Sequence, residues 1–67
     1  MKNLGQRSLL EIMEAHPETE TLFRRYDEAL GACVVCTRLF ETPEGLEENE
    51  PLVFKGLLRA LEDMLQE

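Results

Sequence analysis

Hydrophobic residues recur along the chain at the three- and four-residue spacing that is typical of amphipathic helices. A first helix is predicted to begin after Ser8, which can form a capping box with Glu11. It should end near Ala15, because a residue that precedes a proline avoids helical dihedral angles. A second helix is predicted over residues 18–30, with Gly31 as its C-cap.

Residues 33–42 fit two interpretations. Val34 and Val35 are β-branched, which favours a buried strand. A strand needs a partner, however, and the pattern predicts no other strand in the chain. A helix would place Val35, Leu39 and Phe40 on one stripe with Cys36 close to it, so a short helix is expected here.

The rest of the chain predicts an acidic connection followed by the strongest helix. Residues 42–45 form a turn signal, and residues 46–49 are expected to contain one helical turn at most. The last helix is predicted over residues 51–66, with Pro51 in its first turn. Gly56 lies inside it, where a glycine either weakens a helix by up to ~1 kcal/mol or lets another helix approach closely.

These elements predict an all-α fold, a compact bundle of four short helices in one domain that spans residues 1–67. The last helix has a wider apolar face than three short partners need to cover. We therefore expect a protein partner or a second copy of the chain to bind this helix through Leu57, Leu58, Leu61 and Leu65. The expected core contains Leu9, Ile12, Leu22, Phe23, Tyr26, Leu39, Phe40, Leu57 and Leu61.

The net charge of the chain restricts the classes of molecule that are expected to bind it. The 67 residues include 14 acidic and 7 basic side chains, for a net charge of −7. Such a field repels phosphate backbones and anionic lipid surfaces, so neither nucleic acid nor a membrane is expected as a partner. No run approaches the roughly 18 apolar residues that span a bilayer, and residues 1–7 do not resemble a signal peptide. A cytoplasmic protein is expected, in which cysteines are mostly reduced.

Cys33 and Cys36 are the candidate site. Two intervening residues place both sulfur atoms on one face of a helical turn, within reach of a disulfide. Cys33 should lie at the helix N-terminus, where free N–H groups stabilise a thiolate and lower its pKa. Cys36 should be less exposed and suit a resolving role, and Arg38 could add positive potential.

Two other interpretations of the cysteines stay open. Both could be small residues of an inert core. Both could ligate zinc or an iron–sulfur cluster, but only if two subunits share the site, because one chain supplies too few ligands. His16, before a proline, is interpreted as a loop residue, and Thr37 in place of a histidine excludes c-type haem attachment.

The order of these features resembles the hybrid-cluster-protein-associated redox-disulfide domain, a family described as similar to the N-terminal domain of iron–sulfur repair proteins. The resemblance rests on a helix that ends in His16-Pro17, an apolar Leu22-Phe23 pair, Gly31-x-Cys33-x-x-Cys36 and a closing leucine-rich helix. It implies a compact helical fold over nearly the whole chain and a redox-active pair at Cys33 and Cys36. Thr37 stands where the family often has proline.

The function expected from the sequence is an accessory in thiol redox or electron transfer. The alternatives are a non-catalytic helical interaction module and a metal or iron–sulfur site between two subunits. No Ser/His/Asp set, phosphate loop or carboxylate dyad is present, so the sequence predicts no catalysis beyond the two thiols and no cofactor or metal within one chain.

Overall fold

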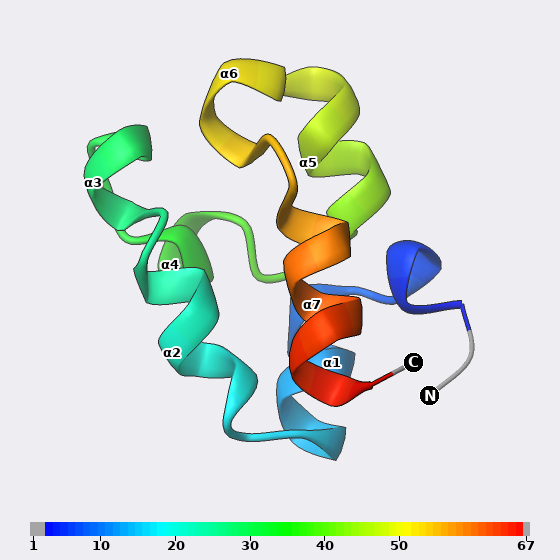
Figure 1. The fold of residues 1–67 in the computed structure, drawn as a ribbon. Coiled ribbons are helices and arrows are strands. Elements are labelled where there is room, and N and C mark those ends of the chain that lie inside the picture. Colours follow the sequence, from blue (N-terminus) through cyan, green and yellow to red (C-terminus); the bar gives the residue numbers. More distant parts are fainter. Residues whose placement is uncertain (1–2, 67) are drawn as a thin grey trace.

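Helices make up all the regular structure in residues 3–66, the part that the computed structural model describes (Figure 1). The radius of gyration is 10.5 Å, close to the ~11 Å expected for a compact chain of this length. The all-α compact fold is therefore confirmed. The helices in chain order are the 3-10 turn η1 (Leu4–Gln6), α1 (Leu9–Ala15), α2 (Thr19–Arg24), α3 (Asp27–Leu30), α4 (Val34–Thr37), α5 (Pro43–Asn49), α6 (Pro51–Phe54) and α7 (Leu57–Leu65).

The first helix, α1, begins and ends where the sequence predicts. Ser8 accepts a hydrogen bond from the Glu11 N–H, and the Glu11 side chain bonds back to Ser8, which completes the capping box. Two further N–H groups donate to the distant segment that follows α4. Leu9 donates to the Glu41 carbonyl and Leu10 to the Leu39 carbonyl, both at 3.0 Å.

This cap on α1 explains why the helix expected over residues 33–42 is wrong in length. The helical part, α4, ends at Thr37. Residues 39–41 leave the helical path, and the carbonyls of Leu39 and Glu41 accept hydrogen bonds from N–H groups of α1, which would otherwise lack partners. A contact distant in sequence therefore competes with local helix formation, and it prevails.

The second expected helix is divided into α2 and α3. The Arg25 and Tyr26 N–H groups donate to the carbonyls of Leu22 and Phe23, so the chain tightens into a 3-10-like turn between the two segments. The Tyr26 ring packs against Phe54, with ring centroids 5.7 Å apart. Gly31 ends α3 with φ 78°, so its predicted C-cap role is confirmed.

The last expected helix is also divided. Lys55 has φ −54° and ψ 124°, and Gly56 has φ 77° and ψ 9°, the two central residues of a type II β-turn. The third residue of such a turn favours glycine because its φ is positive. The prediction of one continuous helix over residues 51–66 is therefore wrong, and Gly56 separates α6 from α7.

The acidic connection contains a full helix, α5, where one turn was expected. Thr42 caps it by accepting a hydrogen bond from the Gly45 N–H, and Pro43 occupies its first turn. Turn η1 packs against α5. The two elements approach closely at Gly5, because a Cβ at this position would lie 2.7 Å from Cγ of Glu44 in α5.

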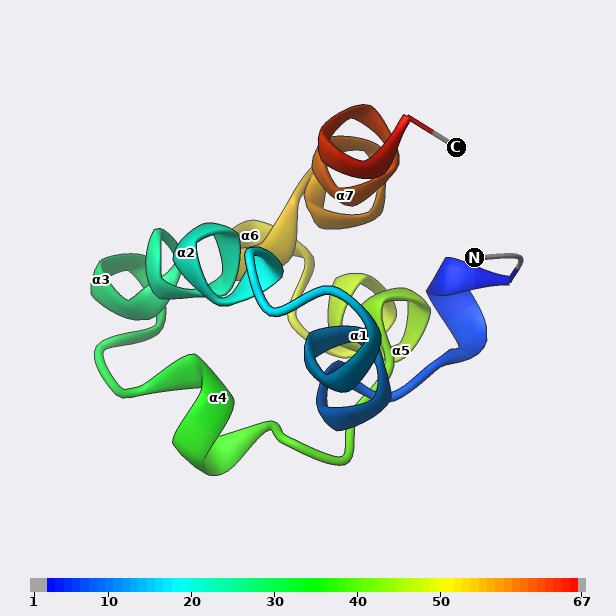
Figure 2. The same ribbon diagram turned by 90° about the horizontal axis from the view of Figure 1, so that it is seen from below.

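The core lies between α1, α2, α5 and α7, with α2 and α4 on one side of α1 and α5 and η1 on the other (Figure 2). Phe40 was expected in the core, but its side chain is 77% exposed. It lies between Leu39 and Glu41 in the segment that caps α1 and points away from the molecule's interior. Tyr26 and Leu39 are half-buried. The buried apolar residues are Leu4, Leu9, Ile12, Leu22, Phe23, Val34, Leu46, Phe54, Leu57 and Leu61.

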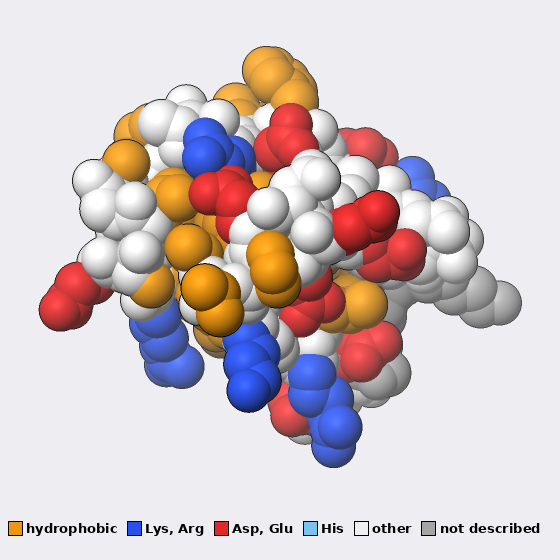
Figure 3. Space-filling view, turned by 90° about the horizontal axis from the view of Figure 1, so that it is seen from above, with side chains coloured by type: hydrophobic (Ala, Val, Ile, Leu, Met, Phe, Trp, Pro, Cys, Tyr) orange, Lys and Arg blue, Asp and Glu red, His pale blue; other side chains and the backbone are white. Residues whose placement is uncertain are grey.

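The four leucines proposed to bind a partner all contact the core of their own chain. Leu57 and Leu61 are buried, and Leu58 and Leu65 are half-buried against the core. Binding of a partner to α7 stays a prediction. Among residues 3–66, the most exposed large apolar residue is instead Leu52 of α6, and Figure 3 shows hydrophobic side chains on the face that carries α3 and α6. None of the described helices is long and apolar enough to cross a membrane.

Candidate functional site: the Cys33–Cys36 turn

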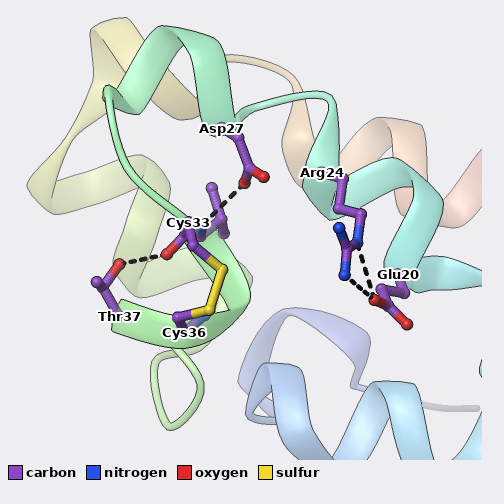
Figure 4. The surroundings of a disulfide bond; sticks show 7 residues. Glu20, Arg24, Asp27, Cys33, Cys36 and Thr37 are labelled. Atoms are coloured by element: carbon purple, nitrogen blue, oxygen red, sulfur yellow. Dashed lines mark hydrogen bonds and ion pairs between the residues drawn. A yellow bond between two sulfur atoms is a disulfide. The ribbon is translucent and has the colours of Figure 1, made fainter.

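Cys33 and Cys36 lie at the start of α4, with their sulfur atoms at disulfide-bonding distance (Figure 4). Their Cα atoms are 5.2 Å apart, within the range that disulfides span. Cys33 is the N-cap of α4 and has extended dihedral angles, and Cys36 lies within the helix. The prediction that this spacing lets the pair close is confirmed.

Val34 anchors the turn to the core. Its side chain is fully buried, and α4 packs against α2. The Val34 N–H, the first of α4, donates to Oδ1 of Asp27 at 2.8 Å. Asp27 begins α3, so this hydrogen bond links the start of α3 to the start of α4 and fixes the approach of the chain to Cys33.

Backbone and side-chain hydrogen bonds hold Cys33 at both its carbonyl and its sulfur. Sγ of Cys33 accepts a hydrogen bond from the Cys36 N–H at 3.1 Å. The Thr37 hydroxyl donates to the Cys33 carbonyl at 2.8 Å, and the Thr37 N–H donates to the same carbonyl. The two hydrogen bonds to the Cys33 carbonyl involve no sulfur atom, so neither requires the sulfur–sulfur bond in order to form.

The two cysteines differ in exposure, in the order opposite to the one expected. Cys36 is exposed, whereas Cys33 is half-buried. Successive residues of a helix are rotated by about 100°, so Cys36 lies about 200° around the axis from Val34. Because Val34 faces the core, Cys36 must face away from it. The expectation that Cys36 is the less exposed cysteine is therefore wrong.

Arg38, expected to add positive potential near the thiols, is engaged elsewhere. Its guanidinium makes a two-pronged ion pair with Glu50, with Nε to Oε1 at 2.8 Å and Nη2 to Oε2 at 3.3 Å. The hydrogen bond from Arg38 holds the pKa of the Glu50 carboxyl below its usual value, and the same bond raises the pKa of Arg38. The pair joins the end of α4 to the junction of α5 and α6.

The surroundings of the pair offer little other chemistry. Among residues 3–66, no three His, Cys, Asp or Glu side chains lie close enough together to hold a metal ion, and no pocket is found. His16 lies at the end of α1, with its ring Nδ1 3.7 Å from the Glu18 carboxylate. What the arrangement can do chemically is thiol–disulfide exchange at an exposed turn.

Asp27 and Thr37 are the two supporting residues that the sequence did not identify as such. Asp27 is six residues before Cys33, and no motif relates the two positions. Thr37 carries a weak signal, because threonine in a helix often bonds to the carbonyl four residues earlier. Asp27 could be found only from the path of the chain through Gly31, which brings the two helices together.

Comparisons of the chain with protein-family models, with curated proteins and with solved structures found no match. The resemblance to the redox-disulfide domain therefore stays a prediction. The function has to be argued from the geometry of the cysteine turn.

Proposed function

We propose that this protein is a small thiol–disulfide exchange protein of the cytoplasm, an accessory in thiol redox or electron transfer. In this proposal Cys33 and Cys36 cycle between a dithiol and a disulfide. The observation that carries it is the pair of sulfur atoms at bonding distance in a turn whose second cysteine is exposed. The resemblance to the redox-disulfide domain implies the same pair.

The support of the turn favours a reversible bond. Val34 lies in the core, Asp27 holds the Val34 N–H, and Thr37 holds the Cys33 carbonyl. None of these contacts uses a sulfur atom, so the bond can open and close while the backbone keeps its place. A pair held in this way loses little freedom when it closes, because its two ends already face each other.

The exchange reaction needs only a partner with a thiol or a disulfide. In the oxidising direction, a partner thiolate attacks one sulfur of the disulfide and the other sulfur leaves as a thiolate. A second partner thiolate then attacks the mixed disulfide. The partner leaves as a disulfide, having lost two electrons, and this protein gains them as a dithiol after its thiolates take up protons.

A redox titration tests the proposal. The folded protein is equilibrated with mixtures of reduced and oxidised dithiothreitol or glutathione, free thiols are alkylated, and the oxidised fraction is read by mass. We expect a two-electron transition near the cytosolic range, about −220 to −320 mV. The Cys33→Ser, Cys36→Ser double variant is the matched control and should show no transition.

Two results would overturn the proposal. One is a pair that stays reduced at potentials well above the cytosolic range. The other is a pair of thiols that react with the alkylating reagent only after urea unfolds the chain, because such thiols belong to an inert interior. Far-UV circular dichroism of each sample shows whether the chain was folded during the reaction.

A further inference from the structure

We infer that Cys36, and not Cys33, is the cysteine that forms the mixed disulfide with a partner, and that Cys33 is the leaving and resolving sulfur. This assignment reverses the one that helix position alone favours. It rests on the proposed exchange function and deepens it. Three properties of the turn lead to it: exposure, the hydrogen bond to Cys33, and the position of Asp27.

Exposure determines which sulfur a partner can reach. Cys36 is exposed and Cys33 is half-buried, because Val34 holds the start of α4 against the core. Attack on a disulfide requires the incoming thiolate to approach the target sulfur in line with the sulfur–sulfur bond, so access to that sulfur limits the rate. Cys36 is the more exposed residue of the pair, so attack on Cys36 is favoured.

The hydrogen bond to Cys33 determines which sulfur leaves. Sγ of Cys33 accepts the Cys36 N–H at 3.1 Å, and this bond strengthens when the sulfur gains negative charge. A stabilised thiolate is the better leaving group and the weaker nucleophile. The N-cap position that suggested an attacking Cys33 therefore favours its departure from the disulfide.

Asp27 adds an electrostatic bias to the same side. Its carboxylate bonds to the N–H of Val34, next to Cys33, and Figure 4 shows Asp27 on the Cys33 side of the disulfide and away from Cys36. An incoming thiolate is an anion, and a carboxylate repels it. Approach to Cys36 keeps the anion farther from this charge.

Attack on Cys36 breaks the disulfide and leaves Cys33 as a thiolate. A partner thiolate bonds to Sγ of Cys36, the Cys33–Cys36 bond breaks, and the electron pair of that bond goes to Sγ of Cys33. In the reducing direction, the Cys36 thiolate attacks a partner disulfide and releases one partner thiolate. Cys33 then attacks Sγ of Cys36 and releases the other. In both directions, the mixed disulfide is on Cys36.

The test maps the mixed disulfide on the wild-type chain. Oxidised protein is mixed briefly with reduced glutathione, the exchange is stopped with acid, and the freed thiol is blocked with N-ethylmaleimide. Residues 26–38, between two tryptic sites, contain both cysteines, so fragmentation of this peptide locates each label. We expect glutathione on Cys36 and maleimide on Cys33 in about tenfold excess over the reverse arrangement. Equal amounts, or glutathione mainly on Cys33, would overturn the inference.

Single-thiol variants give a second measurement for the case in which the mixed disulfide is too short-lived to trap. Reduced Cys33→Ser and Cys36→Ser are each treated with glutathione disulfide. Serine is a favoured N-cap residue, so Cys33→Ser should keep α4. We expect Cys33→Ser, which retains Cys36, to form the adduct about tenfold faster than Cys36→Ser. Faster reaction of Cys36→Ser rejects the assignment but leaves the exchange function intact, whereas reaction of neither folded variant rejects the function itself.

Discussion

The hydrogen bond from the Val34 N–H to the Asp27 carboxylate is the single contact that most directly positions Cys33. At 2.8 Å it satisfies the first N–H of α4, which, like the first N–H groups of any helix, has no acceptor within the helix itself. It also spans the loop in which Gly31 takes a positive φ. At the scale of one residue, Asp27 therefore acts as a cap for a helix that begins seven residues later.

Replacing Asp27 tests this role. Asp27→Ala removes the acceptor and should lower the free energy of unfolding by about 1–2 kcal/mol, as the loss of other helix caps does. Asp27→Asn keeps an acceptor oxygen and should lower the free energy of unfolding by clearly less. Urea unfolding of the oxidised proteins, followed by circular dichroism, measures both values. Equal losses in the two variants would show that the charge, and not the hydrogen bond, matters.

At the scale of elements, Gly56 determines where α6 ends and α7 begins. Its φ of 77° is one that residues with a Cβ adopt at a cost of about 1–2 kcal/mol. Nothing lies within 4 Å of the position that a Cβ would occupy. The cost of a substitution there should therefore come from the backbone alone.

We expect Gly56→Ala to destabilise the protein by about 1–2 kcal/mol and Gly56→Asn by less, because asparagine tolerates the left-handed region better. In a continuous helix the outcome would differ, since alanine in place of glycine stabilises a helix interior. Chemical denaturation measures both variants. A Gly56→Ala protein more stable than the wild type would contradict the assignment of Gly56 to a turn between α6 and α7.

The ion pair between Arg38 and Glu50 joins α4 to the α5–α6 junction and predicts a pH dependence. The folded-state pKa of Glu50 lies below its unfolded value, because Arg38 donates to the carboxylate. The stabilisation is present above the unfolded pKa and is lost as the pH falls through the folded value. Acidification from neutral pH to below the usual pKa of a glutamate should therefore weaken the fold.

Glu50→Gln should make the loss of stability between pH 7 and acidic pH smaller than in the wild type. Unfolding in urea at each pH measures this difference. Glu48→Gln is the matched control, because Glu48 is exposed on the neighbouring helix α5 and no ion pair to it is found in residues 3–66. If both variants respond alike, the pH dependence reflects net charge and not this pair.

The whole molecule depends on a small core in which Phe54 is fully buried. Truncation of a buried phenylalanine to alanine costs about 3–5 kcal/mol, as much as the roughly 3–5 kcal/mol that a core of this size supplies. Phe54→Ala should leave the chain largely unfolded at 25 °C. Phe54→Leu should fold with reduced stability, since leucine fills part of the space.

Phe40 provides the control for this prediction. Its side chain is 77% exposed, so Phe40→Ala should change the free energy of unfolding by less than about 0.5 kcal/mol, the usual range for surface substitutions. Thermal unfolding followed by circular dichroism compares the variants. If Phe40→Ala lowered the free energy of unfolding as much as Phe54→Leu does, the result would show that Phe40 belongs to the core.

Reduction of the disulfide tests the stability of the whole fold in the second redox state. The bond closes a loop of only four residues, and the chain-entropy model assigns it about 2 kcal/mol. We expect dithiothreitol to leave the helical circular dichroism spectrum nearly unchanged and to lower the free energy of unfolding by about this amount. A reduced protein that loses its helices would show that the fold requires the disulfide. That result would contradict the proposed cycle, because a pair that cycles must stay folded when it is reduced.

Local chemistry in the sequence determined the all-helical class, the start of α1 at Ser8, the C-cap at Gly31 and the ability of Cys33 and Cys36 to meet. Each of these depends on residues within one or two turns of each other, whose spacing is visible in the chain. Thr42 and Pro43 carried the same kind of signal for the start of α5. This signal was not recognised, because the acidic residues that follow are also typical of a solvated connection.

The tertiary structure alone decided where helices break and which cysteine faces outward. Residues 39–41 leave the helix because the carbonyls of Leu39 and Glu41 cap α1, more than 25 residues earlier in the chain. Phe40 is exposed as a result, and Phe54 occupies the core. Cys36 is exposed because Val34, two positions before it, is buried against α2. The spacing of the two cysteines determines only that their sulfur atoms can bond. Contacts between segments distant in sequence determine which of the two cysteines is exposed.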